Sequence, residues 1–376
     1  MTHVGDALRG LKLGAQEIAN KSHLLLSRVD AILGGEKASL AEVRAISAGL
    51  RLPMHVLAKG ARMEDSGSEL TPLFRRTGPH SEDFDITVER VASFVEGALS
   101  VLPSRNSLPN WLAELDATKT SYEEADRIAK KFRNQIFEFP EDEPANDLPN
   151  LIGSLEGIIL SPLSYSKYEG VSLIAENYCF IFVSPRFSGR MLFTLGHEIG
   201  HLIAHHKYGS VALFESASQI GTFGAGSLGE SFVDAFASCL LLPDVGVAKT
   251  LRVVRDHFEI KSKNLTDREI LTLARFYGVS FEVAARRCED LGLLPNGYGH
   301  ALAAKVKTEF GSAEKRAEQL ELPPRIPVKI PKISIGLAKA LNRNIRAGEV
   351  SLGWASDRLG LSIGEILASN RRPQAS

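Results

Sequence analysis

The chain has 376 residues, of which 44% are hydrophobic and 24% are charged, and its net charge is −1. That length suits two or three domains, and the composition is that of a soluble globular protein. The N-terminus lacks the basic start and apolar run of a signal peptide, and no apolar stretch approaches membrane-spanning length. Secreted and membrane proteins are therefore excluded, and cytoplasmic residence without membrane contact is expected.

The cysteine and charge patterns bear on disulfide bonds, metal ligands and nucleic-acid binding. Cys179, Cys239 and Cys288 are isolated and form no C-x-x-C pair, so we expect reduced core residues rather than disulfides or zinc ligands. Residues 1–60 carry eight basic and five acidic side chains, and residues 301–376 carry thirteen and seven. Mild basicity at both ends suits DNA contact, although such asymmetry is also ordinary for solvated surfaces.

The first 60 residues predict short helices separated by turns. A second helix at residues 15–20 and a third at 25–33 are joined by a tight turn at 21–23, and Gly34-Gly35 ends the third. Ser39 caps a fourth helix, and Pro53 opens a fifth. Five short helices in this order predict an all-α helix-turn-helix domain over residues 1–60.

This stretch resembles the Xre/Cro family of DNA-binding domains through Gln16-x-Ile18-Ala19, Ser27-Arg28-Val29-Asp30-x-Ile32 and Leu50-x-Leu52-Pro53. The resemblance implies that the third helix enters the major groove. It makes Lys21, Ser22, Ser27 and Arg28 candidate base and phosphate contacts. The alternative is a partner-binding or dimerising helical domain whose charges are only solvated, and a homodimer is a further expectation.

Residues 61–83 are rich in Gly, Ser, Pro and charge and predict a linker. A domain over residues 84–300 follows. Its first predicted helix covers residues 84–102, and a second begins with a capping box at Ser121–Glu124 and runs to Phe137. Three β-rich runs come next, at residues 155–160, 171–175 and 178–183. A small sheet packed on a helix over 189–206 predicts an α+β domain. Residues 165–176 are expected to contact an extended substrate.

The helix at 189–206 contains the H-E-x-x-H signature at His197–His201. Two histidines four residues apart share a helix face, so both imidazoles can reach one zinc ion at about 2.0–2.1 Å. Glu198 points into the same cleft and is the natural base for a water molecule activated there. The nearby His205 and His206 are left outside the metal set, because a histidine at a helix C-terminus more often complements the dipole or caps carbonyls.

A second motif supports the first. Glu230 and Asp234 are four residues apart on a predicted helix that begins 29 residues after His201. Glu230 fits a third zinc ligand, and Asp234 fits an acceptor that holds a ligand imidazole in its tautomer. The alternative is an amphipathic helix with two solvated carboxylates. The glycine-rich loop at 221–229 between the two helices is expected to form a mobile lid or the rim of the cleft.

Together, Phe193–His206 and Glu230–Pro243 resemble the ImmA/IrrE family of zinc metallopeptidase-like proteins. The resemblance implies a gluzincin-like fold, Zn²⁺ on His197, His201 and Glu230, and general base catalysis by Glu198. Gly196 stands where the family often has Ala, and Asp234 where it often has Asn; neither change removes a ligand. Residues 301–376 form a basic helical region that could contact nucleic acid, cap the structure or mediate dimerisation.

Two hypotheses follow. The first is a zinc-dependent metalloendopeptidase coupled to a DNA-binding domain. By resemblance to the family, its substrate would be a transcriptional repressor in a bacterial stress or mobile-element response. The second is a DNA-binding transcription regulator whose peptidase-like domain acts as a sensor or as a partner-binding module.

Overall fold

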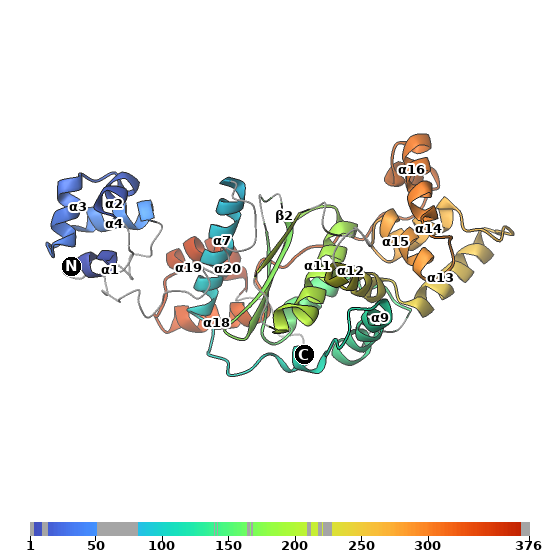
Figure 1. The fold of residues 1–376 in the computed structure, drawn as a ribbon, viewed down its shortest axis with the longest axis horizontal. Coiled ribbons are helices and arrows are strands. Elements are labelled where there is room, and N and C mark those ends of the chain that lie inside the picture. Colours follow the sequence, from blue (N-terminus) through green and yellow to red (C-terminus); the bar gives the residue numbers. More distant parts are fainter. Residues whose placement is uncertain are drawn as a thin grey trace. The chain divides into compact units, whose positions relative to one another are not determined.

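The computed structural model describes residues 4–9, 14–50, 82–138, 140, 142–163, 166, 168–208, 212–216, 220 and 228–369. The chain divides into two compact units, Met1–Pro72 and Leu73–Ser376 (Figure 1). The predicted helix opening at Pro53 and the predicted linker at 61–83 lie outside the described residues, except that residues 82 and 83 begin a helix of the second unit. The division into domains that the sequence suggested stays a prediction.

Four described helices make up the first unit. They are α1 (Val4–Arg9), α2 (Ala15–Ser22), α3 (Leu26–Leu33) and α4 (Leu40–Leu50). Ile18, Val29 and Ile46 are fully buried among them, so one small apolar core holds the helices together. His23 ends α2 with the left-handed φ of 54°, and α3 begins three residues later. The tight turn between the second and third helices is therefore present, whereas DNA binding by this unit stays a prediction.

Arg28 fastens α3 to the start of α4. Its guanidinium donates to Glu42 at 2.6 Å, to Glu36 at 2.7 Å and to the carbonyl of Lys37 at 2.9 Å. Glu42 also accepts the backbone N–H of Ser39, while the Ser39 hydroxyl accepts the N–H of Glu42. This reciprocal capping box starts α4 where the sequence predicted. The positive charge of Arg28 is thus committed to the unit's own carboxylates.

A four-stranded mixed sheet lies at the centre of the second unit. Its strands are β1 (Ile158–Pro162), β2 (Tyr168–Ala175), β3 (Tyr178–Val183) and β4 (Leu213–Ser216). The order is β1-β3-β2-β4, with β1 parallel to β3 and the other pairs antiparallel. Glu176 and Asn177, both left-handed at φ 47° and 63°, form the two-residue turn between β2 and β3. The small sheet among helices confirms the predicted α+β class for this domain, but β4 was not predicted.

Helices cover both faces of this sheet. Ile181 and Val183 of β3 belong to the core beneath α11 (Ser188–Ala204), which contacts β2 and β3 (Figure 1). Side chains alternate along a strand, so Phe182 points to the other face. There its ring meets Phe94 of α7 (Glu82–Leu99) edge-on, with the centroids 5.2 Å apart. The sheet is consequently buried on both sides, and β2 and β3 are almost wholly inaccessible to solvent.

The second unit contains further helices that pack against this centre or against one another. In chain order they are α8 (Asn110–Glu114), α9 (Tyr122–Lys131) continuing into the π-helix η1 (Phe132–Ile136), α10 (Leu148–Ser154), the 3₁₀ turn η2 (His206–Tyr208), α12 (Leu228–Leu241), α13 (Asp244–His257), α14 (Asp267–Phe276), α15 (Phe281–Asp290), α16 (Tyr298–Phe310) and α17 (Ala313–Gln319). The predicted N-cap Ser121 precedes α9, and a complete capping box of Thr266 and Glu269 begins α14. All three cysteines are buried thiols, as predicted.

The C-terminal helices α18 (Ile335–Arg346), α19 (Leu352–Leu359) and α20 (Ile363–Ser369) belong to the second unit. α19 packs on α7, and α18 contacts α10 and β1. The buried amide of Asn344 donates to the carbonyl of Val101 at 3.0 Å, and Arg358 donates to the Ser93 hydroxyl at 3.2 Å. These contacts favour the structural cap among the roles suggested for the C-terminal region.

Membrane-spanning potential can be assessed for the described helices. None of them is by itself long and apolar enough to cross a membrane, and one bent pair, Gly229–Leu241 with Asp244–His257, would pass on length and composition.

Glu42→Gln tests the role of the Arg28–Glu42 contact in the first unit. The hydrogen bond from Arg28 and the N–H of Ser39 lower the pKa of Glu42 to about 2. A carboxylate with a depressed pKa stabilises the fold above its ordinary pKa, and this contribution is lost as the pH falls towards 2. We therefore expect faster hydrogen exchange of residues 26–46 in the variant at pH 7, and a shrinking difference from wild type below pH 4. A difference independent of pH would contradict this account.

Candidate metal centre

The site begins with two histidines on α11. His197 and His201 are fully buried, and their Nε2 atoms lie 3.0 Å apart. The spacing of four residues places both on one face of the helix. The other faces of α11 are apolar and enter the core through Leu195, Ile199 and Leu202, all 0% exposed. Burial of those faces fixes the rotation of the helix, and so the direction in which both imidazoles point.

α12 packs closely along α11. A Cβ atom added to Gly200 would lie 3.0 Å from the Cβ of Val233, which is closer than most such contacts. Glycine at this position therefore allows the two helices to approach each other closely. At the far end of α12, the buried guanidiniums of Arg133 and Arg287 donate to the carbonyls of Leu240 and Leu242, at 2.9 Å and 2.8 Å. The close approach of the two helices brings the carboxylates of α12 to the histidines.

Each imidazole is oriented through its Nδ1 atom. Asp234 Oδ1 lies 2.9 Å from Nδ1 of His197, and Nδ1 of His205 lies 2.7 Å from Nδ1 of His201. With Nδ1 occupied, the lone pair of each Nε2 faces the other histidine's Nε2 and the carboxylates nearby. Asp234 therefore has the predicted neighbour. His205 stays outside the metal set and orients a predicted ligand instead.

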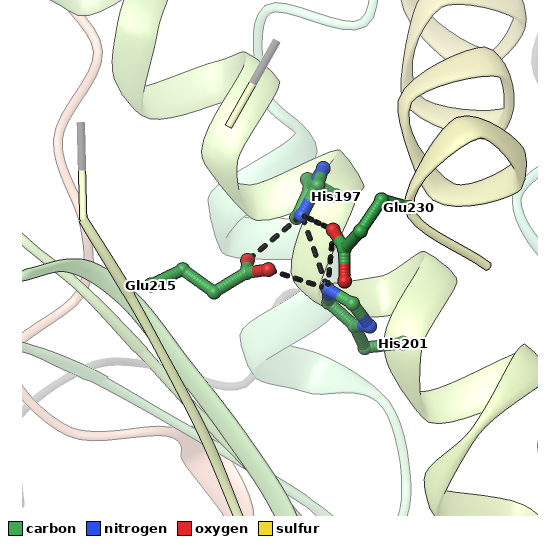
Figure 2. A group of neighbouring side chains, drawn as sticks. All are labelled: His197, His201, Glu215 and Glu230. Atoms are coloured by element: carbon green, nitrogen blue, oxygen red, sulfur yellow. Dashed lines mark hydrogen bonds and ion pairs between the residues drawn. The ribbon is translucent and has the colours of Figure 1, made fainter. Parts of the chain in front are cut away.

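Two carboxylates face the Nε2 atoms, as Figure 2 shows. Glu230 of α12 lies 3.6 Å from His197 Nε2 and 3.8 Å from His201 Nε2. Glu215 of β4 lies closer, at 2.7 Å and 2.9 Å, with one carboxylate oxygen on each histidine. Sequence reasoning missed Glu215, because a single acidic residue in a four-residue strand has no spacing that connects it to H-E-x-x-H.

Glu198 lies on the other side of the same helix turn, against β2. Its Oε2 accepts a hydrogen bond from the Ser172 hydroxyl at 2.5 Å, and Ser172 also lies 3.2 Å from Nε2 of His206. Its Oε1 is buried and has no hydrogen-bond partner among the described residues. A Cβ atom on Gly170 would meet this oxygen at 1.8 Å. Only glycine at this position of β2 leaves room for the carboxylate.

Burial and mutual repulsion shift the pKa values of these groups. Burial together with the charge of Glu215 raises the pKa of Glu230 to about 7, and the same two causes raise the pKa of Glu198 well above its ordinary value. Burial lowers the pKa of His201 to about 4, so its imidazole is neutral at pH 7. Burial opposes the protonation of His197, but hydrogen bonds to two neighbouring carboxylates outweigh it and raise the pKa of this imidazole well above its ordinary value. Imidazoles beside several carboxylates form a site that a divalent cation would stabilise.

The residues present fit a metal ion. One ligand atom from each of His197, His201, Glu215 and Glu230 lies within 4.8 Å of all the others. In a tetrahedral zinc site with bonds of about 2.0–2.1 Å, the ligand atoms are about 3.4 Å apart. Imidazole nitrogens with carboxylate oxygens are a donor set that zinc accepts. The three residues predicted as ligands are thus brought together, and Glu215 lies with them.

The residues predicted to contact DNA differ in their exposure and in their partners. Ser27 is exposed at the start of α3, next to the exposed Leu25 and Leu26. Ser22 is 3% exposed and its hydroxyl donates to the carbonyl of Ile18 at 2.6 Å, so the structure does not present it to a ligand. The guanidinium of Arg28 is held by Glu36 and Glu42. The side chain of Lys21 lies outside the described residues. Of the loop predicted at 221–229, residues 221–227 also lie outside them, and Leu228 and Gly229 begin α12 instead of belonging to a loop.

An α+β domain with an H-E-x-x-H helix and a glutamate from the following helix defines the class of metallopeptidase-like domains. Comparison with known families agrees. Residues 158–289 match Peptidase M78, described as the IrrE N-terminal-like domain. This match spans about a third of the chain, includes all of the residues around the two histidines, and supports the resemblance to ImmA/IrrE. A search of curated proteins found no match to the chain.

Asp234→Ala tests whether this carboxylate supports metal binding. Loss of the acceptor frees the His197 ring to rotate, and we expect zinc affinity to fall about 10- to 100-fold. The measurement is competition with a chromophoric chelator. Asp234→Asn is the matched control, because its amide oxygen can still accept from Nδ1 and should retain most of the affinity. Equal affinity in wild type and Asp234→Ala would contradict the assigned role.

Proposed function

We propose that the second unit is a zinc-dependent metallopeptidase that hydrolyses a peptide bond in a protein substrate. The observation that carries this proposal is the convergence of His197, His201 and Glu230 beside the buried carboxylate of Glu198. Zinc held there would act as a Lewis acid that polarises the scissile carbonyl and makes a water molecule more acidic. The match to a peptidase family supports the proposal independently of the geometry.

Glu198 performs the proton transfers in this proposal. Burial and the charge of Glu215 raise the pKa of Glu198 well above the ordinary value, which makes the carboxylate a stronger base. It takes the proton from the attacking water and delivers it to the leaving amine. Ser172 holds Oε2 at 2.5 Å, which leaves Oε1 as the atom that exchanges the proton. Asp234 and His205 hold the two imidazoles in place throughout.

The protein substrate we propose is a transcriptional repressor, with the first unit binding DNA. The family resemblance supports the choice of substrate. The turn between α2 and α3 and the exposed Ser27 support DNA binding. In this arrangement, DNA binding by the first unit brings the peptidase to DNA-bound regulators.

A second candidate is a regulator whose metal domain senses an ion or a partner. One observation favours it. Glu215 contacts both Nε2 atoms more closely than Glu230 does, so two carboxylates together with the two imidazoles offer four protein ligands. A site closed in this way resembles a structural zinc centre more than a catalytic one.

Glu198→Gln distinguishes the two candidates. The amide cannot act as a base but does not remove a ligand, so we expect unchanged zinc content and a loss of about 10²- to 10⁴-fold in cleavage. Cleavage of candidate repressors is followed by mass spectrometry, and zinc by elemental analysis. Glu156→Gln, an exposed carboxylate of the same unit, is the control. Full proteolysis by Glu198→Gln would overturn the role of Glu198. Unchanged transcriptional regulation in cells that carry Glu198→Gln would favour the regulator with a sensing metal domain.

Ser27→Glu tests DNA binding by the first unit. A negative charge on the exposed start of α3 would face phosphates, so we expect DNA affinity to fall at least about tenfold. Fluorescence anisotropy with the promoter DNA of the protein's own gene provides the measurement. Thr308→Glu adds the same charge to an exposed position on α16 and should leave affinity unchanged. Equal loss in both variants would show a nonspecific charge effect and contradict groove contact by α3.

A further inference from the structure

The strand β4 covers the edge of the sheet that lies beside the candidate metal centre. β2 is the strand nearest to Glu198, because Gly170 and Ser172 both touch that carboxylate. An extended peptide that added to the outer edge of β2 would lie along the site, a common way for proteins to hold peptides. In the described structure that edge is paired with β4, from Ser172 opposite Leu213 to Tyr168 opposite Ser216.

The register of this pairing directs Glu215 at the histidines. Glu215 lies opposite Gly170, and residues opposite each other on paired strands point to the same face. For Gly170 that is the face towards Glu198. On this face the carboxylate of Glu215 reaches both Nε2 atoms, at 2.7 Å and 2.9 Å.

We propose that β4 is an internal substitute for the substrate: it pairs with the peptide-binding edge of β2 and supplies Glu215 as a fourth protein ligand of the metal. The described state is then the latent form of the peptidase whose activity is proposed above, and the inference rests on that function. Catalytic zinc sites have three protein ligands and one open position, whereas closed sites have four. Activation requires β4 to leave β2, so that an extended segment of the substrate takes its place.

The length, position and register of β4 support its displacement in this proposal. It is four residues long, lies at the edge of the sheet and pairs with β2 through an irregular register between Tyr168 and Gly170. On the face opposite Glu215, the Phe214 ring packs edge-on against Tyr168 with the centroids 5.7 Å apart. A short edge strand of this kind opens at a lower free energy than the central strands β2 and β3.

Two variants of the full-length chain separate the ligand from the strand that carries it. Glu215→Gln keeps the shape of the side chain and removes its charge. Phe214→Ala keeps the carboxylate and removes the ring contact that helps to hold β4 on β2. Glu156→Gln and Phe276→Ala make the same chemical changes at exposed positions of the second unit and are the matched controls. Thermal unfolding by circular dichroism verifies that each variant is folded.

The first readout is access of a small ligand to the metal. Acetohydroxamate is titrated into the Co²⁺-substituted protein and followed by visible absorption. If Glu215 closes the site, wild type and both controls bind acetohydroxamate weakly, and Glu215→Gln binds it at least about tenfold more tightly. Phe214→Ala also binds more tightly than wild type, because the strand leaves more often. Zinc affinity falls at least about tenfold in Glu215→Gln, since a ligand has been weakened.

The second readout is hydrogen exchange of the β4 amides with and without zinc. Zinc should slow their exchange in wild type and in Glu198→Gln, and should not do so in Glu215→Gln. Zinc-loaded wild type that binds acetohydroxamate as tightly as Glu215→Gln would overturn this inference and leave the metallopeptidase proposal standing. Wild type without stoichiometric zinc would overturn both. If zinc leaves the hydrogen-exchange rate of the β4 amides unchanged in wild type and in every variant, Glu215 is also excluded as a ligand.

Discussion

The close contact between α11 and α12 is the constraint on which the site depends. The two histidines belong to one helix and the carboxylates of Glu230 and Asp234 to the other, so the site exists only where the helix surfaces meet. Gly200 allows Val233 to approach to a distance that a larger side chain would prevent. Buried arginines hold the far end of α12 by its carbonyls, which fixes the helix along its axis as well as against its neighbour.

Four carboxylates lie close to the two imidazoles, which is unusual because burial of unpaired negative charge destabilises a folded protein. Glu198, Glu215 and Asp234 are all buried, and Glu230 is partly so. Buried carboxylates that lie close together raise each other's pKa values or require a cation. Burial, together with the charge of Glu215, raises the pKa of Glu198 well above its ordinary value. The same crowding of carboxylates would favour a divalent ion at the two imidazoles.

Elements on one face and at one edge of the sheet surround the site. The C-terminal helix α19 packs on α7, which in turn covers the face of the sheet opposite α11. At the edge of β2, the short strand β4 occupies the position that, in our proposal, an extended substrate would take. In the first unit, Arg28 lies on α3, the helix predicted to enter the major groove of DNA. Its guanidinium forms ion pairs with Glu36 and Glu42, so the structure uses it for intramolecular contacts.

The sequence alone determined whatever depends on local spacing. The structure contains three such short-range patterns: the histidines four residues apart, Glu230 and Asp234 four residues apart, and the N-cap at Ser39. Only the tertiary structure decided the roles of Glu215, Ser172 and His205. Glu215 and Ser172 reach the site through strand pairing and register, which no periodicity within a strand specifies. The orientation of His205 towards His201, like the burial of Ser22, depends on how the neighbouring elements pack.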